Sequence, residues 1–485
     1  MNLKIKTITT LLVLVFGAFF VYPTSIAYAS TLRSTSTYNQ NAEASSNAET
    51  SAAETSATET SDQSTSDSSS SSSGAPSIIG KAAIVMNYKT GEILYAKNID
   101  TEEYPASTTK IMTAYLFSQD KNPDDTLTYT KSAAAQPANS LSVNYDLLGV
   151  GDTIQASDVM HALFLISAND CAYVEADAVA GNKTAFAALM NAEVQKLGLK
   201  RTHFTNPNGL FNEENYSTAY DMSVIVRKAF SVPWIREDMG TKSAVITAST
   251  GKSVTLTSDN KNLGIDGCIG GKTGYLPGHG RDLINVYERN GEILIGVIYN
   301  DIWGTNDTDV FNDMKKIINY AYSEKQSVYK AKGTVIGNDP VSYNLFVFFG
   351  PTETINVPLT LDEDIYYYNI PLNEQDFTIK SDVGNVNAWA LASDPSSAKI
   401  LVSDGRQYSA TYTATADISF WTIVDANLTT YVICGIILLI ILLIILVIVF
   451  RTINGIRRRK RRNLEKRRKQ RKIRRMHDRM ERRKK

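Results

Sequence analysis

The sequence is poor in cysteine. Only three of its 485 residues are Cys, and Cys434 lies inside an apolar run, which leaves Cys171 and Cys268 outside it. This number excludes a disulfide framework of the kind that holds small secreted domains together. We expect Cys171 and Cys268 to be small buried side chains, and a single bridge between them stays open.

Histidine is also scarce, with four residues in the whole chain. His161, His203 and His279 lack the spacing of a zinc pair, so the sequence predicts neither a metal site nor a cofactor. His161 lies in an apolar helical run and is expected to be a core residue, whereas His203 opens a turn. His279 is the candidate for a contact at the rim of a site.

The net charge of the whole chain is zero, because 50 Lys and Arg balance 50 Asp and Glu, but the charges are unevenly distributed. From Arg451 to the end the chain carries 20 basic and 3 acidic residues, whereas the preceding part carries 30 and 47. The basic end is therefore a separate segment with its own role rather than part of a neutral globule.

The two ends of the chain carry the pattern of an exported, anchored protein. Residues 1–29 read as a signal peptide, with Lys4 and Lys6 before an apolar stretch and Ala27-Tyr28-Ala29 as the cleavage site; an uncleaved anchor is the alternative. Residues 30–77 are rich in Ser, Thr, Ala and Glu and predict a disordered linker.

Residues 431–450 form a run of twenty residues without a charge. As a helix this run is about 30 Å long, the thickness of one hydrocarbon core. The basic residues 451–485 follow at once, which predicts a cytoplasmic tail and an extracytoplasmic main body. We expect this tail to contact anionic lipid, and nucleic acid is the disfavoured alternative.

Residues 78–330 predict one α+β domain, because strands at both ends enclose helices. The predicted elements are a hairpin turned at 88–91, helices over 156–197, a second hairpin over 282–299 turned at Asn290-Gly291, and a helix over 309–322. Residues 331–425 alternate apolar and polar residues between short turns and predict a small all-β domain.

The stretch A-S-T-T-K, residues 106–110, places Ser107 and Lys110 three residues apart where a helical pattern begins. On a helix these two side chains share a face. A serine hydroxyl needs a base to become a nucleophile, and a lysine amine is a base only when neutral. Lowering the lysine pKa from about 10.4 to about 7 costs roughly 4 kcal/mol, which burial and a second cation can supply.

Two further motifs accompany this pair in the order and with the separations of one known set. Ser167-Ala168-Asn169 follows an apolar helical run, and Lys272-Thr273-Gly274 follows a Gly pair about 100 residues later. Each motif alone is a common turn. Together with S-x-x-K they match the S-x-x-K, S-x-N and K-T-G motifs of penicillin-binding proteins and class A β-lactamases.

The chain resembles the low-molecular-mass penicillin-binding proteins that act as serine-type D-alanyl-D-alanine carboxypeptidases. The stretches that carry the resemblance run from about 83 to 300: A-I-V-M-N-Y-K-T-G-E-I-L-Y-A-K-N, Y-P-A-S-T-T-K-I-M-T, L-I-S-A-N-D-C-A, L-G-L-K-R-T-H-F-T-N-P-N-G-L, Y-S-T-A-Y-D-M-S and G-G-K-T-G-Y. The resemblance implies a penicillin-binding/β-lactamase-like transpeptidase fold, with an antiparallel sheet and a helical subdomain.

The resemblance also implies the roles of eight residues. Ser107 is acylated by the terminal D-Ala-D-Ala of a peptidoglycan stem pentapeptide, and Lys110 takes its proton; Ser167 and Asn169 relay a proton to the leaving D-alanine. Lys272 attracts the substrate carboxylate, Thr273 and Gly274 lie along the substrate, and Tyr275 completes the oxyanion hole with Ser107. β-Lactam antibiotics would acylate the same serine.

Three departures from the family pattern stand out. Leu276 to Asp282 replace the residues that usually follow K-T-G, and the usual arginine after the last strand is missing from Asn300-Asp301-Ile302-Trp303-Gly304. Arg281 is a candidate substitute as carboxylate anchor. A full transmembrane span also replaces the amphipathic C-terminal helix typical of the family.

Three alternative functions stay open at this point. A D,D-endopeptidase would share every motif. A class A β-lactamase would carry E-x-x-L-N, which the sequence lacks. A non-catalytic wall-binding protein would suit the linker and the β domain, but it would not explain two costly buried lysines.

Overall fold

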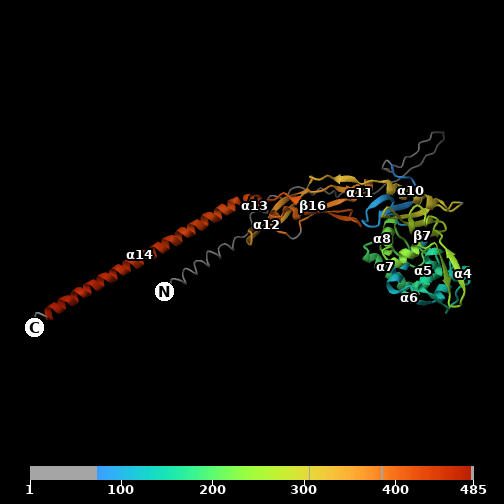
Figure 1. Cartoon of the computed structure of the whole chain (residues 1–485), viewed down its shortest axis with the longest axis horizontal. Coiled ribbons are helices and arrows are strands. Elements are labelled where there is room, and N and C mark those ends of the chain that lie inside the picture. The colour runs from blue at the N-terminus through green and yellow to red at the C-terminus, as the bar shows by residue number, and fades with distance from the viewer. Residues whose placement is uncertain (1–73, 305, 384–385, 482–485) are drawn as a thin grey trace, which may run out of the picture. The chain divides into compact units, whose positions relative to one another are not determined.

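The computed structural model describes residues 74–304, 306–383 and 386–481 (Figure 1). All of them belong to one unit, Ser69–Lys485. The predicted signal peptide and nearly all of the predicted linker lie outside the described residues, so both stay predictions.

The first sheet has five antiparallel strands in the order β2-β1-β9-β8-β7. Both predicted hairpins are confirmed, and Asn290 and Gly291 have φ angles of 51° and 81°, as a tight hairpin turn requires. Strand β7 ends the sheet, so one of its edges has no strand partner among the described residues. The bounds are β1 Ala82–Asn87, β2 Ile93–Lys97, β7 Cys268–Leu276, β8 Gly280–Arg289 and β9 Glu292–Asp301.

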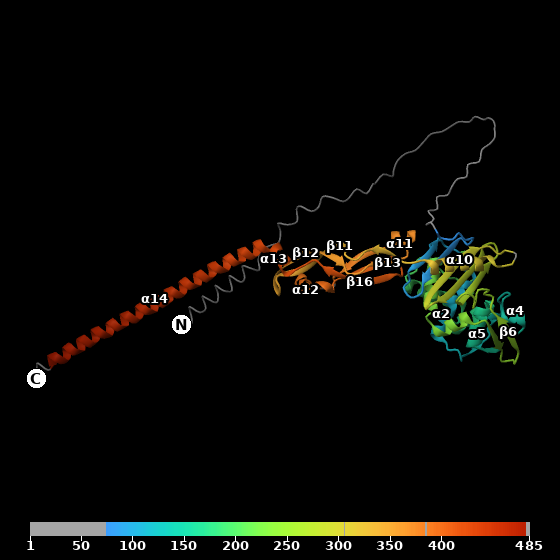
Figure 2. The ribbon, with the colours of Figure 1, turned by 45° about the horizontal axis from the view of Figure 1, so that its top comes forward.

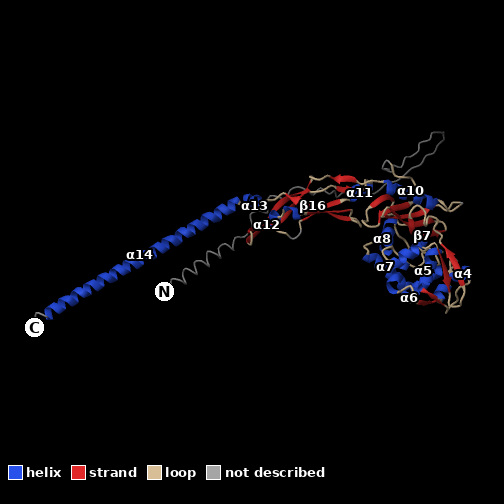
Figure 3. Cartoon of the chain, in the orientation of Figure 1, coloured by secondary structure: helices blue, strands red, loops and turns tan. Residues whose placement is uncertain are grey.

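Helices cover both faces of this sheet, because apolar residues alternate along its strands (Figure 3). Ile84 and Val297 pack toward the helical group, whereas Val85 and Ile298 pack toward α10. The group contains α2 Lys110–Asp120, α5 Ala156–Leu165, α6 Asn169–Ala180, α7 Lys183–Lys196, α8 Ala219–Ala229 and α9 Pro233–Gly240, and α10 spans Asp309–Ser323.

Cys171 and Cys268 are buried and free, so the disulfide bridge that the sequence left open is not formed.

Shorter elements connect the helices of the group. The short elements are η1 Ala106–Thr109, β3 Thr126–Thr128, α3 Lys131–Ala134, α4 Leu141–Tyr145, β4 Thr153–Gln155, β5 Ser243–Thr247 and β6 Ser253–Thr257.

A second five-stranded sheet, in the order β11-β12-β16-β15-β14, forms the predicted β domain. Its apolar core includes Val357, Leu359, Ile400 and Val402. Short helices that the alternating pattern did not predict pack on this core. The elements are β10 Ser327–Lys330, β11 Val335–Phe346, β12 Phe349–Leu361, β13 Ile365–Tyr367, α11 Pro371–Asp376, β14 Thr378–Asp382, α12 Ala388–Ser393, η2 Pro395–Ser397, β15 Lys399–Ser403, β16 Ser409–Ala416 and α13 Phe420–Ala426.

The chain ends in one long helix, α14, Leu428–Glu481 (Figure 2). It contains the uncharged run 431–450 and continues without a break into the basic segment. By length and composition this helix can cross a membrane, as the sequence predicts.

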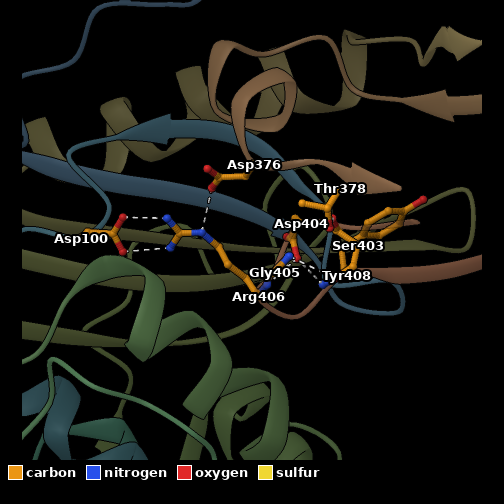
Figure 4. A network of polar contacts seen from close by, with 8 residues as sticks. All are labelled: Asp100, Asp376, Thr378, Ser403, Asp404, Gly405, Arg406 and Tyr408. Atoms are coloured by element: carbon orange, nitrogen blue, oxygen red, sulfur yellow. Dashed lines mark hydrogen bonds and ion pairs between the residues drawn. The ribbon is translucent and has the colours of Figure 1, made fainter. Parts of the chain in front are cut away.

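Polar contacts join the two sheets. Arg406 donates to both carboxylate oxygens of Asp100, at 2.9 and 2.8 Å, and to Asp376 at 3.1 Å (Figure 4). Beside this ion pair, buried Glu92 accepts from the backbone N–H of Tyr368 at 3.0 Å. We call these five residues the junction.

Candidate active site

Ser107 lies on the 3₁₀ turn η1, directly before helix α2. Pro105 begins this turn, and its carbonyl accepts the N–H of Thr108 at 2.9 Å. Ala106 has a φ angle of 44°, a left-handed conformation that costs a non-glycine residue roughly 1 kcal/mol. The turn therefore holds the backbone at Ser107 in a conformation that the surrounding fold must enforce.

Gly209 is part of what enforces it. A Cβ at this position would lie 1.7 Å from the carbonyl oxygen of Ala106, and Gly209 itself has a φ angle of +78°. Only glycine permits this approach between the loop and the turn. The T-N-P-N-G-L stretch is thus packed directly against the serine turn.

Lys110 is completely buried on the first turn of α2. Its Nζ lies 3.0 Å from Ser107 Oγ, 3.0 Å from Asn169 Oδ1 and 2.7 Å from the carbonyl oxygen of Asn208. Burial, and next the charge of Lys272, hold the pKa of Lys110 well below its ordinary value. A neutral amine has two N–H donors and one lone pair, so the two oxygen acceptors can take both donors and leave the lone pair for the serine hydroxyl.

Ser167 lies between helices α5 and α6, and Asn169 begins α6. The Nδ2 group of Asn169 donates to the carbonyl of Ala138 at 2.8 Å, which orients its Oδ1 toward Lys110. Ser167 is 6% exposed, has a φ angle of 60°, and its Oγ has no hydrogen-bond partner among the described residues. A strained residue with a buried, unpaired hydroxyl is typical of a functional position.

Lys272 lies on β7 with 1% of its surface exposed, and its Nζ donates to the carbonyl of Thr273 at 2.9 Å. Burial, with a smaller contribution from Arg281, lowers the pKa of Lys272 to about 7 against the opposing effect of Asp259. Two buried amines, of which Lys272 helps to lower the pKa of Lys110, are expensive to hold, which favours a functional rather than a structural role.

Gly274 allows the serine turn to lie against β7. A Cβ on Gly274 would be 3.2 Å from Ala106 Cβ and 3.1 Å from Asp282 Cβ. On the same strand Thr273 is almost buried, whereas Tyr275 is 41% exposed. The free edge of β7 next to the serine turn offers backbone groups to an extended peptide.

Arg281, the candidate anchor for the substrate carboxylate, is already paired with a carboxylate of the protein. Its guanidinium forms an ion pair with Asp307, with Nε–Oδ1 and Nη2–Oδ2 distances of 3.0 Å, and it lies 4.5 Å from the ring centre of Trp303. Its Nη1 also donates to the carbonyl of Gly274 at 3.3 Å. A substrate carboxylate would have to compete with Asp307 for this group.

The three histidines that precede α14 have separate surroundings. His161 bonds to Asp238, and His203 contacts the carbonyl of Glu214 at 2.6 Å. His279 packs between Tyr104 and Phe211, with ring centres 4.5 and 5.1 Å away. Within the described ranges no three His, Cys, Asp or Glu side chains gather as metal ligands.

Two groups of the site were not predicted. The carbonyl of Asn208 is a backbone acceptor for Lys110, and its only sequence signal was the turn cluster around it. Buried Asp282 lies beneath Gly274, and burial raises the pKa of its carboxyl well above the ordinary value.

A cavity of about 840 Å³ lies elsewhere in the described chain. It is lined by residues of β2, α10 and α11 and by 75–78, and none of the eight predicted site residues contributes to it.

Comparison with known proteins gives the class to which this fold and site belong. The D-alanyl-D-alanine carboxypeptidase family of peptidases matches residues 69–302. D-alanyl-D-alanine carboxypeptidase of Streptomyces sp. K15 is 30% identical over 262 residues, which cover 51% of this chain and 89% of that protein. The chain therefore belongs to the D-alanyl-D-alanine carboxypeptidase family, within the penicillin-binding/β-lactamase-like fold.

A second curated relative is covered over a smaller share of its length, whereas a solved structure is covered almost completely. D-alanyl-D-alanine carboxypeptidase DacF of Bacillus subtilis is 28% identical, with 53% of this chain and 66% of that protein covered. The crystal structure of the Streptomyces K15 DD-transpeptidase matches with 30% identity and a TM-score of 0.46, covering 51% of this chain and 99% of that one.

Proposed function

We propose that this protein is a membrane-anchored serine D-alanyl-D-alanine carboxypeptidase that removes the terminal D-alanine from peptidoglycan stem pentapeptides. The observation that carries the proposal is the position of Lys110 Nζ between Ser107 Oγ and two oxygen acceptors. A buried amine with a lowered pKa is a base at neutral pH, and its lone pair can face the hydroxyl that it must activate.

In the first step Ser107 Oγ attacks the carbonyl carbon of the penultimate D-alanine while Lys110 accepts the hydroxyl proton. The backbone N–H groups of Ser107 and Tyr275 would stabilise the oxyanion. The C–N bond then breaks, and the proton reaches the leaving amine by way of Lys110, Ser167 and Asn169. The unpaired hydroxyl of Ser167 supports its part in this relay.

In the second step water attacks the acyl-enzyme, the C–Oγ bond breaks, and the proton returns to Ser107. Lys272 in its charged form would attract the substrate carboxylate, and Thr273 and Gly274 would lie beside the extended peptide. β-Lactams would acylate Ser107 through the same first step.

Helix α14 would span the membrane once, with its basic end in the cytoplasm next to anionic lipid and the catalytic region outside. The uncharged run of 20 residues and the 20 basic residues after it support this orientation. Protease added to sealed cells should remove the catalytic region and spare the tail, and the opposite result would reverse the orientation.

The catalytic proposal is tested by the full chain in detergent with labelled penicillin and with a D-Ala-D-Ala pentapeptide. Ser107→Ala should abolish labelling and reduce D-alanine release by at least about 10³-fold. Ser231→Ala is the matched control, since Ser231 is exposed and bonds only to the carbonyl of Lys228. Labelling that survives in Ser107→Ala removes Ser107 from the mechanism.

A further inference from the structure

The turn between β11 and β12 exposes two large aromatic side chains. Phe348 is 90% exposed and Phe349 is 65% exposed, and no charged residue occurs between Asp339 and Glu353. Single exposed apolar residues are ordinary, but adjacent phenylalanines at an uncharged, protruding turn indicate a binding surface. We call residues 346–350 the hairpin tip.

The hairpin is attached to the start of α14. The hydroxyl of Tyr431 donates to the carbonyl of Leu345 at 2.6 Å, and the ring centres of Phe346 and Tyr431 are 5.8 Å apart. One turn earlier, Asn427 Nδ2 donates to the hydroxyl of Tyr343 at 2.6 Å. These contacts hold the hairpin tip beside the first turn of the uncharged run.

Tyr431 follows two threonines and is the first residue of the apolar run 431–450. If α14 spans the bilayer, Tyr431 lies where the chain passes from headgroups to hydrocarbon, and aromatic side chains favour this level. The hairpin tip then lies at the same level, because Phe346 packs on Tyr431.

We infer that Phe348 and Phe349 insert into the outer headgroup and acyl boundary of the membrane that α14 spans. The inference rests on the membrane anchor of the proposed function. Lipid is the occupant, rather than a second protein, because the tip is uncharged, is exposed, and adjoins the apolar helix α14 through the contact of Phe346 with Tyr431. Two attachment points would fix how the β domain is turned relative to the membrane, which one helix alone cannot do.

The test uses the full chain in phosphatidylcholine vesicles that carry a photoactivatable diazirine on an acyl chain. After irradiation and digestion, we expect label on the peptide that contains the hairpin tip as well as on α14. Phe348→Ser with Phe349→Ser should reduce the hairpin label at least about fivefold and leave the α14 label unchanged. Retained penicillin labelling shows that this variant is folded.

Val245 provides the matched control, because it is 60% exposed on β5, far along the chain from α14. Its peptide should carry no lipid label, and Val245→Ser should leave the hairpin label unchanged. Label confined to α14 overturns the inference and keeps the anchor, whereas label on neither segment overturns both. A tip that cross-links to a second copy through Phe348→Cys, without lipid label, overturns it in favour of self-association.

Discussion

The serine–lysine site and the junction between the two sheets both hold buried ionisable groups, but they arrange charge in opposite ways. At the site, two amines of the same sign are buried near each other, and Ala106 and Ser167 have left-handed backbone. At the junction, Arg406 is matched by two carboxylates.

The difference separates a region selected for chemistry from one selected for attachment. Like charges and strained residues reduce stability and persist where a reaction needs them, whereas complementary charges cost little. Substitutions should therefore act differently in the two regions: replacing a buried lysine of the site should remove activity without removing stability, and substitutions at the junction should change stability without changing activity.

The largest effect should come from Lys110→Met, which keeps the length of the side chain and removes the amine. We expect penicillin acylation to slow by at least about 10³-fold, because Ser107 loses its base. The free energy of unfolding should rise by about 1 kcal/mol, since a buried polar group disappears. Stopped-flow acylation and thermal unfolding measure the two effects.

Lys228→Met is the control for this variant, because Lys228 is exposed on α8. It should change neither acylation nor stability measurably. A Lys110→Met protein that still acylates at the parent rate would contradict the assignment of the base. One that acylates slowly but is strongly destabilised would contradict the contrast between the two regions.

The next largest effect should come from the backbone of the site, and comparing Gly209→Ala with Gly181→Ala measures it. Both glycines have a φ angle of +78°, but a Cβ at Gly181 meets nothing within 4 Å, whereas one at Gly209 meets the carbonyl of Ala106. Gly181→Ala should cost about 1 kcal/mol of stability and leave acylation intact. Gly209→Ala should cost several times more, about 3 kcal/mol, and lower acylation at least about tenfold.

Denaturant unfolding and penicillin labelling measure this pair of variants. Equal losses in the two proteins would show that only the φ angle matters, and the packing of the loop on the serine turn would then have no role in catalysis.

Much of the fold could be predicted because local chemistry and long-range packing agree. The Asn290-Gly291 turn defines β8 and β9, and the uncharged run 431–450 defines the centre of α14. The short helices α11, α12 and α13 were missed because they are brief and depend on packing against the second sheet rather than on a helical repeat.

The site was predictable where side chains carry the chemistry and unpredictable where the backbone does. S-x-x-K, S-x-N and K-T-G identified residues that the structure brings together, notably Ser107, Lys110 and Asn169. The carbonyl of Asn208 has no residue-type signal. The ion pair of Arg281 with Asp307 joins residues 26 positions apart, which no local pattern reveals.

At the junction, Glu92 predicts a dependence of stability on pH. Burial raises the pKa of Glu92 to about 7 from its ordinary 4.5, and Asp404 and Glu292 add to the shift while Tyr368 and Gln326 oppose it. The protonated form therefore stabilises the folded chain fully below pH 4.5. This contribution falls as pH rises to about 7, because the unfolded chain releases the proton first.

Glu92→Gln should remove that dependence. As the pH rises from 4.5 to 7, the free energy of unfolding of the variant should increase relative to that of the parent by at most about 3 kcal/mol. Above pH 7 this difference should stay constant. Denaturant unfolding at four pH values in this window measures it, and Glu374→Gln on α11 is the control for loss of one exposed carboxylate. Parallel curves for parent and Glu92→Gln would contradict the assignment.

The smallest effect should come from the ion pair that joins the sheets. Arg406 and Asp100 are 21% and 40% exposed, so water screens their attraction, but the contact is bidentate and Arg406 also lies 4.8 Å from the ring centre of Tyr220. Arg406→Gln should therefore lower the free energy of unfolding by about 1 kcal/mol, more than an ordinary surface pair contributes. Lys252→Gln, which breaks the more exposed pair with Asp146, should leave the free energy of unfolding unchanged within the error of the measurement. Penicillin acylation should stay within about twofold of the parent in both variants, because neither residue contacts the serine–lysine site. Slower acylation in Arg406→Gln alone would mean that the attachment of the β domain influences the serine–lysine site. The junction would then affect activity as well as stability, and the two regions would not differ in the way proposed.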